Sequence, residues 1–187
     1  MEGYMTYEQL KEQLRESGRN YDMELIDRAC AVADKAHSGV KRRSGEPYIT
    51  HPLNVASLLG ELGLDSESIS AALLHDVVED TEITKGEIES QFGEEVANLV
   101  DGVTKLGQIT FSTMEEQQAE NLRKMLLAMS QDIRVMIIKL CDRLHNMRTM
   151  TAMPDQKRRD KALETMEVYA PIAHRLGMNN IQEELED

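Results

Sequence analysis

Apolar residues recur at intervals of three and four positions through most of the chain, which is the pattern of helices with one buried face. The clearest example begins at Asp22, a candidate N-cap. Its apolar positions follow helical spacing at Leu25, Ile26, Ala29, Cys30, Ala33 and Ala36. No run alternates apolar and polar residues over the length of a strand. The pattern therefore predicts an all-α fold of about ten helices.

Capping motifs and helix breakers locate the predicted helix ends. Thr6-x-x-Gln9 and Thr84-x-x-Glu87 have the form of capping boxes. Residues 38–52 contain two Gly and two Pro and predict an irregular loop, and residues 107–113 predict a mobile loop that is a candidate conformational element. The predicted helices are 6–17, 22–37, 53–62, 66–80, 84–92, 94–106, 114–130, 132–150, one from 155 that Pro171 kinks or restarts, and one from 179.

Composition limits the function classes. Lys and Arg number 21 against 34 Asp and Glu, a net charge of −13, which argues against direct DNA binding and against an anionic membrane surface. With no Trp and two Phe, the chain lacks the aromatic platforms of single-strand binders. Cys30 and Cys141 lie in apolar helical runs and predict buried, reduced thiols. Neither a secretory signal nor an apolar run of 18 residues is present, so a cytoplasmic protein is expected.

The most informative chemistry lies at the end of the predicted helix 66–80. On one helix, His75 and Glu79 are four positions apart, as are Asp76 and Asp80, so all four side chains crowd one flank. Crowded carboxylates repel one another, and a bound cation removes that cost. The alternative is a solvated acidic helix end, which the helix dipole disfavours. The segment therefore favours a metal site.

Two further residues have the chemistry to complete such a site. His51 stands where the loop enters a helix, and alone such a histidine is usually a capping or packing residue. Asp142 follows a mostly apolar run and is expected to be partly buried, so it needs a partner. That partner is either a metal ion or an arginine, Arg143 or Arg148, in a structural salt bridge. His37, at a helix end, is expected to pack or to form hydrogen bonds.

Taken together, His51, His75-Asp76 and Asp142 form the pattern of the HD superfamily of metal-dependent phosphohydrolases. Four segments resemble the hydrolase domain of the bifunctional Rel/Spo alarmone synthetase/hydrolases: Arg42–Pro52, Ala72–Thr81, Lys139–Thr149 and Ala170–Gly177. The resemblance implies an HD-type domain over residues 21–178, after a helical lead over 1–20. Residues 179–187 begin a helix without a C-cap, as expected of an N-terminal fragment whose connecting helix leads towards an absent synthetase domain.

The resemblance also implies a function. The family uses Mn²⁺ to hydrolyse the 3′-pyrophosphate of guanosine tetra- and pentaphosphate, the alarmones of the stringent response, releasing pyrophosphate and GDP or GTP. By motif, the metal ligands are His51, His75, Asp76 and Asp142, Glu79 and Asp80 serve the attacking water, and the substrate contacts are Arg42, Arg43, Ser44, Asn146 and Thr149. The polyanionic substrate is expected to meet Lys41–Arg43 and the basic residues Lys139, Arg143 and Arg148.

Further expectations follow from the same resemblance. This chain is not expected to synthesise alarmone, and its partners are expected to be the synthetase and regulatory domains of a full-length enzyme. Two alternatives remain open at this stage. One is an HD phosphohydrolase acting on another nucleotide or dinucleotide, because a metal centre does not read the base. The other is a non-catalytic nucleotide-sensing module.

Overall fold

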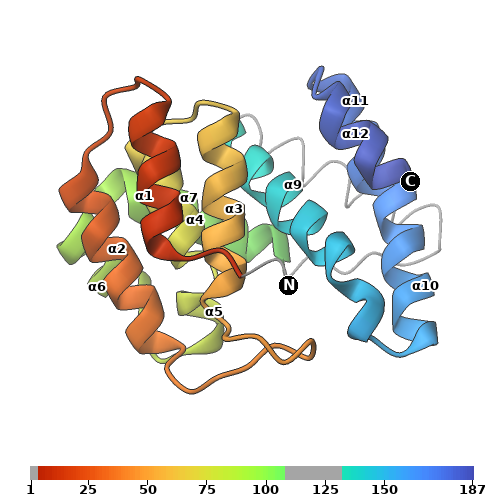
Figure 1. Cartoon of the computed structure of the whole chain (residues 1–187), viewed down its shortest axis with the longest axis horizontal. Helices are drawn as coiled ribbons and strands as arrows, with labels where there is room; N and C mark the ends of the chain where they lie inside the picture. Colours follow the sequence, from red (N-terminus) through yellow and green to blue (C-terminus); the bar gives the residue numbers. More distant parts are fainter. Residues whose placement is uncertain (1–3, 108–131) are drawn as a thin grey trace. The chain divides into compact units, whose positions relative to one another are not determined.

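The computed structural model describes residues 4–107 and 132–187, and Figure 1 shows their arrangement into helices. Within these ranges the repeating secondary structure is helical, and the one isolated β-bridge joins Lys41 to Pro47. The all-α prediction is confirmed. The chain divides into two compact units, Met1–Gln108 and Ile109–Asp187.

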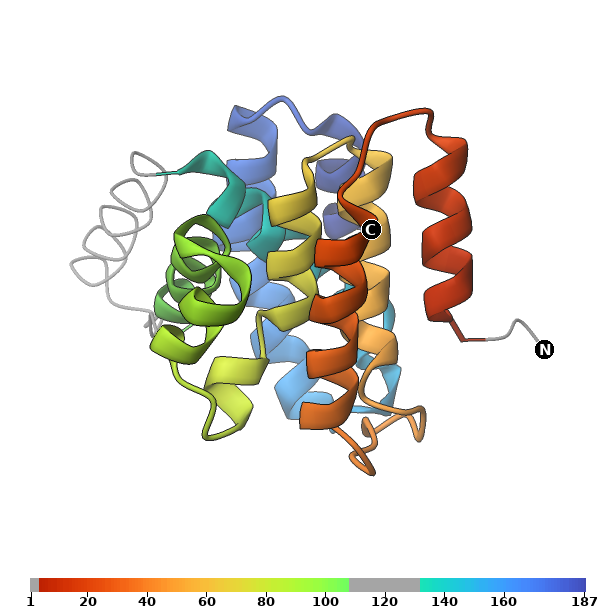
Figure 2. The same cartoon turned by 90° about the vertical axis from the view of Figure 1, so that its left-hand side faces the viewer.

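The first unit contains seven helices in its described part. They are α1 (Tyr7–Glu16), α2 (Met23–Ala36), α3 (Thr50–Glu61), α4 (Ser66–Leu74), α5 (Val77–Asp80), α6 (Lys85–Phe92) and α7 (Glu94–Gly107). Among these described helices, α4 packs against α2, α3 and α7 (Figure 2). Apart from Glu67, its side chains are small or aliphatic, and all of these are buried. Small residues on α4 let neighbouring helices approach closely, so this helix carries His75 into the interior of the unit.

Local hydrogen bonds start α1, α2 and α6 where the sequence predicts, whereas α3 begins at Thr50, inside the predicted loop 38–52. The Thr6 hydroxyl accepts from Gln9 N while the Gln9 side chain accepts from Thr6 N, and Thr84 and Glu87 form the same reciprocal pair before α6. These bonds hold the pKa of Glu87 below its usual value. Asp22 caps α2 by accepting from Leu25 N at 3.0 Å. Both capping boxes and the Asp22 cap are confirmed.

The prediction of a single helix over residues 66–80 is wrong. Helix α4 ends at Leu74, a turn occupies His75 and Asp76, and α5 begins at Val77. The His75 Nδ1 atom lies 2.7 Å from the Ala72 carbonyl oxygen. That carbonyl is the one an unbroken helix would pair with the Asp76 N–H, so the histidine side chain competes with the helical ladder at this point.

The second unit is described from residue 132 onwards. It contains α9 (Ile133–Arg148), a 3₁₀ turn η1 (Met150–Ala152), α10 (Asp155–Glu164), a π-helical segment η2 (Thr165–Tyr169), α11 (Ala170–Arg175) and α12 (Asn179–Glu186). Asp132 caps α9 by accepting from Arg134 N, and the Arg134 guanidinium holds the pKa of this carboxyl below its usual value.

The predicted break at Pro171 takes the form of a widened turn. Proline lacks an N–H and its ring clashes with the carbonyl four residues earlier, Glu167 here. The structure absorbs this clash in the π-helical segment η2, which contains Glu167, and Pro171 then stands in the first turn of α11. The predicted helix 114–130 and all but the first residue of the predicted loop 107–113 lie outside the described residues.

Membrane insertion through a helix finds no support in the described ranges. None of the helices there is both long enough and apolar enough to cross a bilayer.

Two leucines near the end of α3 test how the first unit is stabilised. Leu59 is fully buried, whereas Leu62, the C-cap residue, is 42 % exposed. Leu59→Ala is expected to lower the free energy of unfolding by about 2–5 kcal/mol, because it opens a cavity between packed helices. Leu62→Ala is the matched control, with an expected change of about 0.5 kcal/mol. Urea denaturation followed by circular dichroism measures both, and equal losses would contradict this packing.

Candidate functional site

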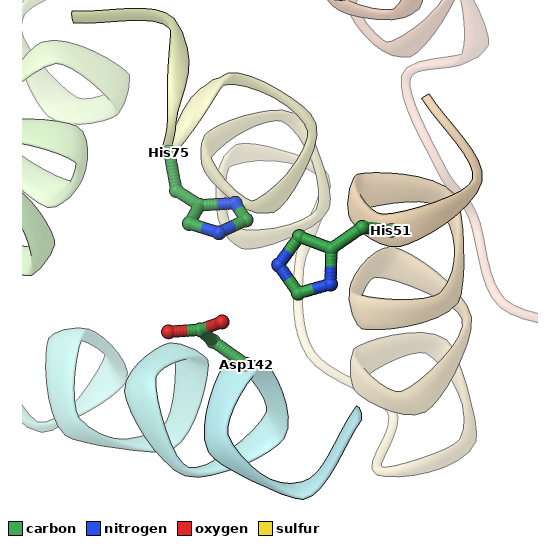
Figure 3. A group of neighbouring side chains, drawn as sticks. All are labelled: His51, His75 and Asp142. Carbon is green, nitrogen blue, oxygen red and sulfur yellow. The ribbon is translucent and has the colours of Figure 1, made fainter. Parts of the chain in front are cut away.

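Two buried histidines approach each other in the first unit. His51 lies in the first turn of α3, where Pro52 fits because the early N–H groups of a helix have no intrahelical partner. His75 follows the last residue of α4. Both residues are 2 % exposed, and their rings meet edge to face with centroids 5.2 Å apart (Figure 3). Two polar rings withdrawn from water in this way need polar partners.

The Asp76 carboxylate lies close to both rings. Its Oδ1 atom lies 3.2 Å from His75 Nε2, and its Oδ2 atom lies 3.7 Å from His51 Nε2. The carboxylate is largely buried but keeps a path to solvent, with 19 % of its side chain exposed. Two imidazole nitrogens and one carboxylate from separate elements therefore point towards one region.

The arrangement fits a divalent metal ion. The contact between His75 Nδ1 and the Ala72 carbonyl requires the proton on Nδ1, which leaves the lone pair of a neutral ring on Nε2. This is the tautomer of metal-binding histidines, whose second nitrogen commonly donates to a carbonyl. Imidazole nitrogen together with carboxylate oxygen suits first-row divalent ions.

Tyr48 orients the shared carboxylate. Its hydroxyl donates to Asp76 Oδ2 at 2.8 Å. Burial, followed by the charges of Asp76 and Asp80, raises the pKa of Tyr48 above its usual value, so the phenol stays protonated and remains a donor. Sequence reasoning missed this role. The available signal was the position of Tyr48, three residues before His51 in the same motif.

The two proposed water-activating acids occupy different surroundings on α5. Asp80 faces inward enough to place its Oδ2 atom 3.6 Å from His37 Nε2, although 44 % of its side chain is exposed. Glu79 is exposed. The four titratable groups of residues 75–80 therefore do not line one continuous helical flank, because the turn at His75 and Asp76 separates the histidine from the two acids of α5.

The loop before α3 presents the residues proposed to contact the base. A tight turn is closed by Gly45 N donating to Arg42 O and by Arg42 N donating to Glu46 O, both at 2.9 Å. Gly45 has φ +95°, a conformation that favours glycine. Arg42 Nε lies 3.6 Å from the buried Glu46 carboxylate, while Arg43 and Ser44 are exposed at the turn.

In the second unit, Asp142 lies on α9 and is 5 % exposed (Figure 3). Lys139 Nζ lies 2.8 Å from its Oδ2 atom, and Asn146 Nδ2 donates to its Oδ1 atom at 2.6 Å. Burial acts to lower the pKa of Lys139, but the charges of Asp142 and Tyr169 and the hydrogen bond to Asp142 together outweigh it, and the pKa is raised. The cation that pairs with Asp142 is thus Lys139, which was expected to meet the substrate.

Three other polar residues on or directly after α9 also form contacts within the second unit. Arg143 forms an ion pair with Glu164 at 2.9 Å and lies over the Tyr169 ring, 4.2 Å from its centroid. Arg148 pairs with Glu184. The Thr149 hydroxyl donates to the His145 carbonyl at 3.0 Å. Four predicted residues are thus placed by unit: His51, His75 and Asp76 converge in the first, and Asp142 is buried in the second.

Comparison with known proteins identifies relatives of the chain. A family model described as an HD domain matches residues 29–179. A Vibrio cholerae protein named guanosine-3′,5′-bis(diphosphate) 3′-pyrophosphohydrolase is 51 % identical over 181 residues, which is 97 % of this chain and 26 % of that protein. The Escherichia coli K12 protein named bifunctional (p)ppGpp synthase/hydrolase SpoT is 55 % identical over 162 residues, 87 % of this chain and 23 % of that protein.

A solved structure is also similar. It is described as a metazoan ortholog of SpoT that hydrolyzes ppGpp and plays a role in starvation responses. The TM-score is 0.61 at 28 % identity, over 90 % of this chain and 95 % of that one. The chain spans about a quarter of the length of the curated bacterial relatives named above.

Two ion pairs on α9 differ in burial and allow a direct test. Lys139 and Asp142 have side chains 15 % and 7 % exposed, against 43 % and 42 % for Arg148 and Glu184. Lys139→Met is expected to lower the free energy of unfolding by about 3 kcal/mol, because a buried carboxylate loses its cation. Arg148→Met is expected to cost less than about 1 kcal/mol, because water screens the exposed pair. Chemical denaturation distinguishes the two, and the reverse order would refute the assignment.

Proposed function

The chain belongs to the HD domain family, and we propose that within this family it hydrolyses the 3′-pyrophosphate of guanosine tetra- and pentaphosphate, releasing pyrophosphate and GDP or GTP. The observation that carries the proposal is the convergence of His51 and His75 on the Asp76 carboxylate. The names of relatives more than half identical to this chain support the choice of substrate.

We propose His51, His75, Asp76 and Asp142 as the protein ligands of a divalent metal ion. The distances among the first three support their part in the set. Asp142 is included because it is a buried carboxylate at the last position of the His, His-Asp, Asp pattern. The donor set suits several first-row ions. Mn²⁺ is the proposed ion because the motifs resemble those of the Rel/Spo hydrolases.

Two acidic residues of the chain, Asp80 and Glu79, are proposed to transfer the proton of the attacking water. When bound, a divalent ion lowers the pKa of water and offsets charge on the phosphate. The water oxygen joins the phosphorus nearest the ribose, and the bond from that phosphorus to the 3′-oxygen breaks as pyrophosphate leaves. Asp80, assisted by Glu79, accepts the proton lost by the water and returns a proton to the 3′-oxygen.

The guanosine part of the substrate is assigned to two segments. Arg42, Arg43 and Ser44 form the turn before α3, and exposed Arg43 offers a planar cation that can stack on guanine. Asn146 and Thr149 supply the contacts from α9. The Asn146 amide also donates to Asp142. In this proposal Asn146 therefore contacts both the substrate and a proposed metal ligand.

We assign this chain to the hydrolase part of a bifunctional, cytoplasmic enzyme. The name of the Escherichia coli relative gives that protein two activities, synthase and hydrolase. This chain, with its HD domain match, corresponds to the second of them. It is therefore proposed to carry no synthase activity, and the synthetase and regulatory domains are its proposed neighbours in the longer enzyme.

A direct assay tests the proposed function. The purified chain with Mn²⁺ is expected to release pyrophosphate from guanosine tetraphosphate, to lose this activity in a chelator and to regain it when Mn²⁺ is returned. Asp76→Asn is expected to abolish turnover and weaken Mn²⁺ binding in calorimetry. Asp155→Asn, whose side chain is 79 % exposed on α10, is the control and should match the unmodified chain.

The same assay separates the alternatives. Turnover of ordinary nucleotides or dinucleotides without release of pyrophosphate from the alarmone would identify an HD hydrolase of different specificity. Binding of guanosine tetraphosphate without turnover would identify a nucleotide-sensing module.

Arg43 offers a test of base recognition. Arg43→Ala is expected to raise KM about tenfold, equivalent to about 1.4 kcal/mol, with kcat nearly unchanged, because stacking on guanine is lost before the chemical step. Arg43→Lys keeps the charge and is expected to keep most of the affinity. Arg159→Ala, at an exposed position of α10, is the control for loss of a surface cation. Steady-state kinetics gives both constants, and an unchanged KM in Arg43→Ala would remove Arg43 from the site.

A further inference from the structure

His37 is a buried histidine that lies outside the proposed ligand set. It is the C-cap residue of α2 and is 5 % exposed. Its Nδ1 atom lies 3.1 Å from the Ala33 carbonyl, and its ring stacks on Tyr48 with centroids 4.3 Å apart and planes 17° from parallel. The ring is therefore held at one nitrogen and on one face.

The other nitrogen is directed at a proposed acid. Because Nδ1 carries the proton that Ala33 accepts, Nε2 of the neutral ring carries a lone pair. Within the described residues this Nε2 atom has no hydrogen-bond partner, and Asp80 Oδ2 lies 3.6 Å from it. That separation is longer than a hydrogen bond, and the half-exposed Asp80 side chain has room to rotate and close it.

The stacked pair serves two neighbouring carboxylates. Tyr48 presents its hydroxyl to Asp76, four residues before Asp80, while His37 presents Nε2 to Asp80. Tyr48 thus reaches the proposed metal ligand and also interacts with Asp80, while His37 faces Asp80 alone of the two. Asp80 belongs to the four-residue helix α5, which by itself gives little support to a side chain, so its half-exposed carboxyl group can turn towards a fixed neighbour such as His37.

We propose that His37 is a positioning residue for Asp80, an inference that rests on the proposed hydrolytic function. Once Asp80 has accepted the proton of the attacking water, its carboxyl group donates a hydrogen bond to His37 Nε2. The lone pair that faces a carboxylate before proton transfer faces a carboxyl O–H afterwards, so the contact stabilises the state that proton transfer creates. The proton stays on Asp80 until the 3′-oxygen takes it.

Two substitutions at His37 separate this role from packing. His37→Phe keeps a ring to stack on Tyr48 but removes Nε2. His37→Gln loses the ring but places an amide where Nε2 stood, with an oxygen that accepts from Asp80. A positioning role predicts a 10- to 100-fold loss of kcat in His37→Phe with KM within about twofold, and partial recovery of kcat in His37→Gln. A packing role predicts the opposite order, with His37→Phe the more active.

A double-mutant cycle connects the effect to its partner. In an Asp80→Asn background, His37→Phe is expected to reduce kcat by no more than about twofold, because the group it acts through has gone. His174→Gln is the control, since His174 is exposed in the second unit and contacts Gln182. Full additivity of the two substitutions would overturn the proposal, as would a His37→Phe variant with unchanged kcat.

Nuclear magnetic resonance of the histidine rings can detect the contact between His37 and Asp80 in the absence of substrate. The expected spectrum places the proton of His37 on Nδ1, and Asp80→Asn is expected to shift the His37 Nε2 resonance while the His174 resonances stay in place. A His37 Nε2 resonance whose chemical shift does not change in Asp80→Asn would overturn the proposal. If instead the unmodified chain releases no pyrophosphate while this shift is seen, the proposed substrate is wrong and the contact between His37 and Asp80 stands.

Discussion

The constraint on which the site depends is that two buried imidazoles share one carboxylate. Burying polar groups without partners costs about 1–3 kcal/mol each, and the neutral His75 ring turns the lone pair of Nε2 towards the Asp76 carboxylate, an arrangement that a bound cation would stabilise. Adjacent residues on a regular helix do not face each other. The turn at His75 and Asp76 removes that restriction, so the interruption between α4 and α5 is the local condition for the site.

This interruption marks where sequence reasoning was sufficient and where it was not. Helix starts at Tyr7, Met23 and Lys85 were predicted because their caps are local hydrogen bonds between residues three apart. The end of α4 was missed because apolar periodicity continues through Val77. It depends on one side-chain hydrogen bond, from His75 to the Ala72 carbonyl, which a pattern of apolar positions does not reveal.

The candidate site also contains residues that could be predicted from the sequence and residues that could not. His51, His75 and Asp76 could be proposed from residue type and order, because metal chemistry restricts ligands to few side chains. Their supporting groups could not, because these depend on contacts across the fold. Tyr48 reaches Asp76 from 28 residues away, and His37 meets Asp80 only because α2 ends beside α5. A histidine at a helix end has the same sequence signature whether it packs or positions an acid.

Charge is the property that the structure revises most. A chain with a net charge of −13 would have to attract the proposed polyanionic substrate through a local field. The sequence suggested α9 as one source, yet its cations Lys139, Arg143 and Arg148 each pair with a carboxylate, which cancels most of their field at a distance. Arg42 is likewise paired with Glu46. In the proposed function, the exposed Arg43 is then the cation of the turn best placed to meet the nucleotide, and a bound metal ion, rather than a basic surface, would balance the charge of the pyrophosphate.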